Sequence, residues 1–291
     1  MRGALSRLPE LGFGLGISTN WPEGLHVADA LLAAEEPLVN YLEIYPGTGE
    51  WLERAKDAVR RWKARDVAMT LHTAALDLWS AEAADDRGIA PTREAEDRVG
   101  PVWCTQDLML TRSSGARVGV LLGAIFTSEA AHAAAARHAA CSQVLRTPLL
   151  LENAPYQLLI GDMHFGAFFA HVAEAADCGL TLDIGHLMGT AILQGCEPSA
   201  LLEGYPFDRV MEVHIAGGRV AGRRYVDDHD APLPARTLEL LAHVLPLCTS
   251  LRAVTYEVQS PALDELVPRL ERVRDVLAAA SFEVAPHRRG A

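Results

Sequence analysis

The chain has 291 residues, 49% of them hydrophobic, and a formal net charge of −12 at pH 7. This length suits one large domain or two small ones with a full apolar core, and the acidic balance argues against a nucleic-acid-binding surface, which needs a basic face to meet phosphates. No apolar stretch is long enough to span a membrane, residues 1–10 lack the apolar core of a signal peptide, and the 5 cysteines form no CxxC pair, so we expect a cytoplasmic protein with reduced thiols.

Apolar runs that are typical of buried strands alternate with helical patterns along the chain. Strands are expected at residues 13–17, 41–45, 67–72, 102–110, 149–152, 180–184, 210–215 and 253–258. Helices are expected at residues 24–34, 51–64, 128–145, 165–178, 198–204, 234–247 and 262–279, and a polar surface helix or loop at 81–97. Repeated pairs of a nearly continuous apolar strand and a helix predict a (β/α)8 TIM barrel of the α/β class, not a doubly wound sheet.

The chain shows no linker, internal repeat or low-complexity segment, so we expect one domain over residues 1–291, with a loose tail after about residue 285. The run from Gly12 to Gly16 is rich in glycine, but Ile17 breaks the GxGxxG pattern. Close packing of the first strand is therefore expected there, not phosphate binding.

Acid and imidazole side chains end most of the later predicted strands, and a further cluster follows the seventh. Because the carboxyl ends of all strands in a parallel barrel meet at one mouth, these side chains are expected to converge. Converging buried carboxylates and imidazoles are costly unless a cation joins them, so the pattern predicts a metal site with more than one ion. Carboxylate and imidazole ligands without a thiolate suit iron, manganese or zinc. The residues are His72, Glu152, Asn153, Asp183, His186, His214 and Glu257, followed by Asp227, Asp228, His229 and Asp230.

Two acids within predicted strands leave alternatives open. Glu43 is either an acid beside the ligands or a buried ion-pair partner, and we favour a structural role. Asp107 is either a ligand or a cap of a loop or helix. Asp228 and Asp230 also fit solvated loop acids. We expect Cys104 to be a buried thiol, and surface or packing roles for His132, His138, His164 and His171.

These motifs resemble the multinuclear non-haem iron-dependent oxidases, which are TIM-barrel relatives of the methanobactin-biosynthesis oxidase with a fold similar to xylose isomerase. The most specific match is Glu-Val-His-Ile-Ala-Gly at residues 212–217, followed by Asp-Asp-His at residues 227–229. Weaker matches occur in family order along almost the whole chain, at residues 14–16, 42–44, 71–72, 121–129, 150–153 and 182–183.

The resemblance implies a ligand set for an iron cluster. Asp107 stands where the family has a histidine, and His186 stands where it often has asparagine. Either Asp107 binds iron and His186 replaces the lost imidazole, or one iron site is weakened. Asn153, Glu43 and Asn20 are expected beside the ligands or the substrate. The implied metal ligands, including these two altered positions, are His72, Asp107, Glu152, Asp183, His186, His214, Asp227, His229 and Glu257.

The resemblance also implies a reaction, namely the iron- and O2-dependent oxidative modification of a ribosomally synthesised precursor peptide, commonly at a cysteine. It implies two or three irons of mixed valence and a small partner protein that recognises the leader peptide. Two alternatives remain open. One is a metal-dependent sugar isomerase, epimerase or hydrolase on the same barrel, although no lysine ends a predicted strand. The other is a non-catalytic partner subunit, suggested by the missing histidine at Asp107.

Overall fold

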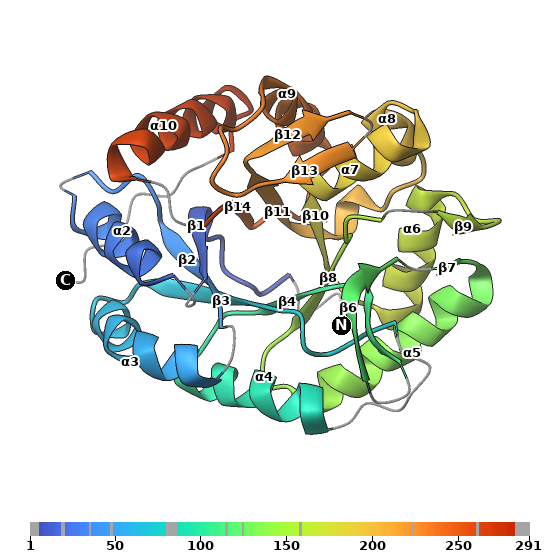
Figure 1. Cartoon of the computed structure of the whole chain (residues 1–291), viewed down its shortest axis with the longest axis horizontal. Coiled ribbons are helices and arrows are strands. Elements are labelled where there is room, and N and C mark those ends of the chain that lie inside the picture. The colour runs from blue at the N-terminus through green and yellow to red at the C-terminus, as the bar shows by residue number, and fades with distance from the viewer. Residues whose placement is uncertain are drawn as a thin grey trace.

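The computed structural model describes residues 6–18, 21–34, 36–46, 49–79, 86–113, 116–123, 125–156, 159–222, 224–259 and 262–282. Parallel strands close into a barrel in which β1 (Gly12–Ser18) pairs with β14 (Ala253–Val258) and with β2 (Tyr41–Tyr45). Figure 1 shows the strands inside a ring of helices. The expected TIM barrel is confirmed. Continuing from β14, the remaining barrel strands are β11 (Val210–Ala216), β10 (Leu180–Asp183), β8 (Leu149–Glu152), β4 (Cys104–Asp107) and β3 (Ala68–Thr73).

The helices pack on the outside of the barrel through apolar stripes. In α3, Leu52, Ala55, Val59 and Trp62 are buried at spacings of three and four residues, whereas the charged residues between them face solvent. The helices are α2 (Pro22–Ala33), α3 (Gly49–Ala64), α4 (Asp86–Val99), α5 (Ser128–Val144), α6 (Phe165–Ala176), α7 (Ile184–Gln194), α8 (Pro198–Leu201), α9 (Ala235–Val244) and α10 (Leu263–Ala279), with short 3-10 turns at Phe207–Arg209 and Leu245–Leu247.

Helix α7 was not expected from the sequence. Most of its residues, including Leu187, Met188 and Ala191, are buried, so the helix has no polar face that would mark its period. The structure therefore corrects His186 from a strand end to the first turn of a helix.

Three short two-stranded sheets were also missed. The fourth predicted strand, residues 102–110, divides into barrel strand β4 and the first strand of a hairpin, and the acidic segment after β11 begins within another hairpin. The pairs are β5 (Leu110–Ser113) with β6 (Ala116–Leu122), β7 (Ile125–Phe126) with β9 (Ile160–Gly161), and β12 (Gly218–Ala221) with β13 (Arg224–Asp227). Two predicted features cannot be compared with the structure. Residues 81–85 of the acidic segment and the tail after residue 285 lie outside the described parts of the chain.

The glycine-rich first strand serves close packing, as expected. A Cβ atom at Gly14 would lie 2.3 Å from the ring of Tyr41, so only glycine leaves room for this tyrosine. Tyr41 is fully buried and its hydroxyl reaches the interior of the barrel, where it donates a hydrogen bond to Glu212.

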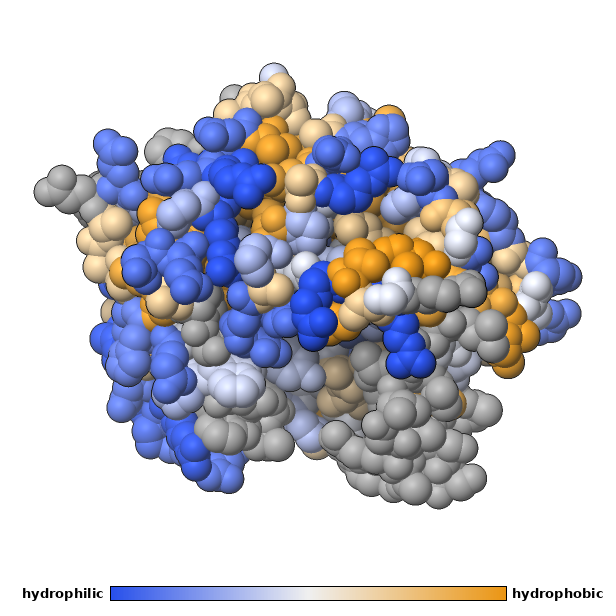
Figure 2. Space-filling model, turned by 45° about the horizontal axis from the view of Figure 1, so that its top comes forward, coloured by the Kyte–Doolittle hydropathy of each residue, from blue (hydrophilic) through white to orange (hydrophobic). Residues whose placement is uncertain are grey.

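Figure 2 shows hydrophilic residues over much of the visible face, with smaller hydrophobic patches between them. The most exposed large apolar side chains include Val220 at 62%, Ile160 at 53% and Trp21 at 40%. Within the described segments, every helix is too short or too polar to cross a bilayer.

Candidate metal centre

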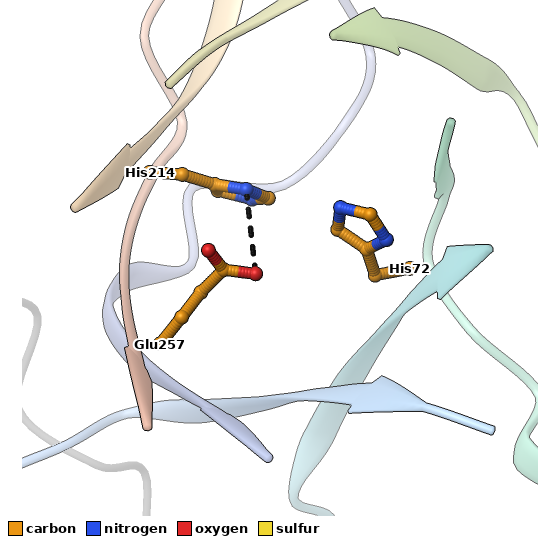
Figure 3. Close-up of side chains that lie close together, drawn as sticks. All are labelled: His72, His214 and Glu257. Carbon is orange, nitrogen blue, oxygen red and sulfur yellow. Dashed lines mark ion pairs between the residues drawn. The ribbon is translucent and has the colours of Figure 1, made fainter. Parts of the chain in front are cut away.

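Acid and imidazole side chains from several barrel strands meet at the C-terminal mouth of the barrel. The strand register places Asp107 beside Glu152 and Asp183 beside His214. Figure 3 shows the side chains of His214, Glu257 and His72 pointing toward one another. The converging residues are Glu43 on β2, His72 on β3, Asp107 on β4, Glu152 on β8, Asp183 on β10, His214 on β11 and Glu257 on β14.

Glu152 lies at the centre of this group and is fully buried. Its Oε2 atom is 2.8 Å from Nε2 of His72, and its Oε1 atom is 3.3 Å from Nδ1 of His214. Potential ligand atoms of His72, Asp107 and Glu152 lie within 4.8 Å of one another, and so do those of Glu152, Asp183 and His186. One carboxylate is thus shared by two groups that could each hold an ion.

Asp183 and His186 are arranged by the start of α7. The Asp183 side chain caps the helix, because its Oδ1 atom accepts a hydrogen bond of 2.5 Å from the backbone N–H of His186. Asn153 holds the backbone of Asp183 by two hydrogen bonds of 2.9 Å. Nδ1 of His186 lies 2.9 Å from the Asn153 carbonyl oxygen, which can only accept, so Nδ1 carries the hydrogen and Nε2 is left to face Asp227 at 3.4 Å.

Asp227 and His229 close one side of the cluster. Asp227 was expected in a loop, but it is the last residue of strand β13. Its Oδ2 atom is 3.1 Å from Nε2 of His229. The same His229 nitrogen is 4.0 Å from Oε2 of Glu257. Burial raises the pKa of Glu257 to about 7.

The imidazole of His214 faces carboxylates on both sides. Nδ1 faces Glu152 at 3.3 Å and Glu257 at 3.9 Å, whereas Nε2 faces Glu43 at 3.2 Å and Glu212 at 3.6 Å. None of these contacts has the geometry of a hydrogen bond, so both nitrogens of this fully buried ring lack a hydrogen-bond partner among the described groups.

Burial and the nearby charges shift the pKa values of the acids and imidazoles in the cluster. Burial, together with the charge of Glu152, raises the pKa of Asp107 and that of Asp183 to about 6. For His72 and His214, burial alone would lower the pKa, but the surrounding carboxylates outweigh it and hold the pKa of both rings well above the usual range. A bound cation would relieve the repulsion between these acids.

The donor atoms fit a metal centre. Buried atoms without a hydrogen-bond partner are rare in proteins and mark a missing ligand or ion when they cluster. Here seven such carboxylate and imidazole atoms gather at one mouth, and their chemistry suits iron, manganese or zinc. They are Glu43 Oε2, His72 Nδ1, Asp107 Oδ1, Glu152 Oε1, His214 Nδ1 and Nε2, and Asp227 Oδ1. The unpartnered Oδ1 atom of Asp107 favours a ligand role over the alternative of a cap.

Glu212, which the sequence analysis did not select as a site residue, supports His214 from below. Its carboxylate is fully buried and accepts hydrogen bonds from Tyr41, Trp103, Thr105 and Thr255 at 3.1, 2.8, 3.2 and 2.7 Å. Its place two residues before His214 on β11, and so on the same face of the strand, was the available signal.

A pocket of about 340 Å³ lies beside the cluster, between the ends of β1, β2 and β14. Glu43, His229 and Glu257 line its polar side, and Ile17 and Trp21 are among the residues of its apolar side. The His229 side chain is 23% exposed and that of Asp227 is 25% exposed, whereas those of Glu152 and His214 are 0% exposed. The cluster is therefore closed at Glu152 and open at His229.

Several expected residues lie apart from this cluster. Asp228 faces Arg219 at 3.7 Å and is partly exposed, and the backbone carbonyl of Asp230 accepts a hydrogen bond from Arg269. Neither acid belongs to a group of potential ligands among the described residues. The packing role expected for His138 is confirmed by its contact of 2.9 Å with the Leu149 carbonyl. Asn20 lies outside the described residues.

Cys104 has the structural role expected from the sequence. This thiol is buried, as expected, and burial raises its pKa to about 12, so it stays protonated and unreactive.

Solved structures define the class of the fold. A xylose isomerase domain protein from Salmonella typhimurium covers 94% of this chain and 99% of its own, with a TM-score of 0.63 and 10% identity. A xylose isomerase-like TIM barrel protein from Mycobacterium smegmatis was solved with magnesium. Its match covers 96% of this chain and 99% of its own, with a TM-score of 0.56 and 13% identity. The chain is thus a xylose-isomerase-like TIM barrel.

Sequence relatives define the family. A UPF0276 protein from Anaeromyxobacter is 29% identical over 273 residues, covering 93% of this chain and 94% of the relative. A UPF0276 protein from Caulobacter vibrioides is 30% identical over 276 residues, covering 92% and 95%. The model of the family described as RiPP precursor modification enzyme MbnB/TglH/ChrH matches residues 14–278. The chain belongs to this family, which confirms the relationship expected from its motifs.

Proposed function

We propose that this protein is a multinuclear iron enzyme that oxidises a ribosomally synthesised precursor peptide, at a cysteine, with O2 as co-substrate. The observation that carries the proposal is the cluster of buried, unpartnered carboxylate and imidazole atoms at the barrel mouth, in a chain of the precursor-modifying family. Bound iron would supply the redox chemistry with O2.

The ligand groups support more than one ion. His72, Asp107 and Glu152 would hold one ion, and Glu152, Asp183 and His186 a second, so Glu152 would bridge them. A third group would consist of His72, His214 and Glu257, with His229 and Asp227 at its open edge.

The remaining residues of the cluster orient these ligands. His214 would bind through Nδ1, which faces Glu152 and Glu257, and would keep its hydrogen on Nε2, where the carboxylates of Glu43 and Glu212 lie. Such contacts select the ring orientation and tautomer of a metal-binding histidine. Asn153 would orient Asp183 in the same way, through its two hydrogen bonds to the Asp183 backbone.

The substrate peptide would enter through the pocket beside His229 and Glu257. The pocket has the size of a small ligand site and could receive one or two side chains of a peptide. Its apolar wall would exclude water from the reacting side chain. A small partner protein that binds the leader peptide would deliver the substrate.

The experiment that tests this function is metal analysis of the full chain after iron-supplemented expression, followed by incubation with a cysteine-containing precursor peptide. We expect at least two irons per chain and a change in peptide mass that requires O2. Less than one transition metal per chain, or an unchanged peptide under air, would contradict the proposal. Zinc or magnesium alone would favour the isomerase or hydrolase alternative, and no metal would favour a non-catalytic subunit.

The position of Asp107 gives a first prediction. We expect Asp107→Ala to lower both iron content and activity, because Oδ1 of Asp107 is aimed into the cluster without a partner. Asp107→His should retain both, since imidazole is also an iron ligand. The measurement is iron per chain and turnover for each variant. Unchanged iron in Asp107→Ala together with loss in His186→Ala would assign the ligand role to His186 instead.

The pocket gives a second prediction. We expect Trp21→Ala to raise KM for the peptide several-fold with iron content unchanged, because Trp21 lines the apolar side of the pocket and is not among the potential ligands. Ile160→Ala is the matched control, because Ile160 on β9 is an apolar side chain that is 53% exposed and does not line the pocket. This variant should leave KM unaltered. Equal KM values for the two variants would place the substrate elsewhere.

A further inference from the structure

Two histidines on neighbouring outer helices bring their imidazole nitrogens together. His132 lies in the first turns of α5 and His171 in the second half of α6. Their Nε2 atoms are 3.2 Å apart, the ring centroids are 4.4 Å apart, and the ring planes are inclined by 80°. His132 is exposed and His171 is half-buried, so solvent reaches the pair.

The protonation of His132 is set by its own helix. Its Nδ1 atom lies 2.8 Å from the backbone carbonyl oxygen of Ser128, which can only accept a hydrogen bond. Nδ1 therefore carries the hydrogen, and Nε2 of the neutral ring presents a lone pair toward His171. A carbonyl that holds the second ring nitrogen is the usual arrangement around a metal-binding histidine.

The spacing of the two nitrogens also suits a shared ion. Two zinc–nitrogen bonds of about 2.05 Å that end on atoms 3.2 Å apart enclose an angle of about 100°, which is close to tetrahedral. Both nitrogens come from helices that pack against each other, so the separation is held by the outer layer of the fold. The donors are nitrogen only, which suits zinc, copper or nickel and not magnesium or calcium.

We propose that His132 and His171 form a second metal site, separate from the barrel mouth, for a divalent zinc, copper or nickel ion. Among the described residues, neither histidine belongs to a group of three or more potential ligands, so water completes the coordination and the ion exchanges readily. The ion would link α5 to α6 and stabilise the folded state by an amount that rises with the logarithm of the free ion concentration above its Kd.

The test is a titration of the full, untagged chain with Zn2+, using the wild type, His132→Ala and His171→Ala. We expect the wild type to bind one Zn2+ that both variants bind at least tenfold more weakly, while zinc binding at the barrel mouth is the same in all three. His243→Ala, which removes an exposed histidine on α9, is the matched control and should keep the site.

A second readout identifies the ligands. With Cu2+ as the probe, electron paramagnetic resonance of the exchangeable ion should show two coupled imidazole nitrogens in the wild type and at most one in either variant. Equal zinc affinity in the wild type and His132→Ala would overturn the proposal. So would a wild type without this site, in which case the 3.2 Å contact is only a hydrogen bond between the two rings.

Discussion

Replacing Glu152 with alanine is expected to remove more bound metal than any other single substitution at the barrel mouth. Glu152 belongs to two of the groups of potential ligands, and its two carboxylate oxygens face His72 on one side and His214 on the other. Loss of a carboxylate that belongs to both groups should therefore release at least one iron and lower turnover by more than about 100-fold, beyond the 10- to 100-fold that residues supporting a ligand usually cause.

The measurement is iron per chain and turnover, with circular dichroism to verify the fold. His214→Ala should behave similarly. Glu96→Gln is the matched control, because Glu96 is also a buried carboxylate, but it bonds the backbone of Arg146 and Thr147 away from the mouth. Wild-type iron in Glu152→Ala would show that the ligand assignment is wrong.

Replacing Glu212 with alanine is expected to have the largest effect on stability. The carboxylate is fully buried and accepts four side-chain hydrogen bonds, so its loss leaves buried donors unpaired and a cavity inside the barrel. We expect a decrease of about 3 to 5 kcal/mol in the free energy of unfolding for Glu212→Ala. Glu212→Gln keeps the shape and one acceptor, so we expect a smaller decrease of about 1 to 3 kcal/mol.

The measurement is urea unfolding in the presence of excess chelator, so that differences in metal content do not enter. The metal-loaded proteins are then compared separately, and both variants should hold less iron because Glu212 supports His214. If Glu212→Ala unfolded at the same urea concentration as the wild type, the network would carry none of the stability assigned to it.

The sequence was most informative where local pattern and topology agree. Strands β2, β8 and β14 begin and end where apolar runs predicted, because short buried strands bounded by polar or turn residues have clear limits. Elements without such contrast were missed. Helix α7 is buried on most sides, and the hairpin strand β12 is largely exposed, so neither alternates in the way that marks a half-buried element.

The site residues were likewise found where they contrast with their neighbours in the sequence, and missed where they do not. Glu152, His214 and Glu257 were found because each stands out as a polar side chain at the end of an apolar run. Glu212 was missed because it lies inside such a run, and on a strand buried on both faces the sequence does not indicate which residues point into the barrel. The role of Asp107 depended on an Oδ1 atom without a hydrogen-bond partner among the described residues, and that of His186 on its contact with the Asn153 carbonyl; no local pattern contains either feature.

The amino-acid sequence by itself determined the barrel, its family and the set of acids and imidazoles at its mouth, because strand periodicity and parallel topology bring strand ends together whatever the detailed packing. The tertiary structure alone decided which of these side chains lie close enough to hold one ion together, which are held by hydrogen bonds, and which face the pocket. It alone also paired His132 with His171, which are 39 positions apart. Such contacts depend on distances of a few ångströms between separate elements, and these are set by how the helices and strands pack against one another.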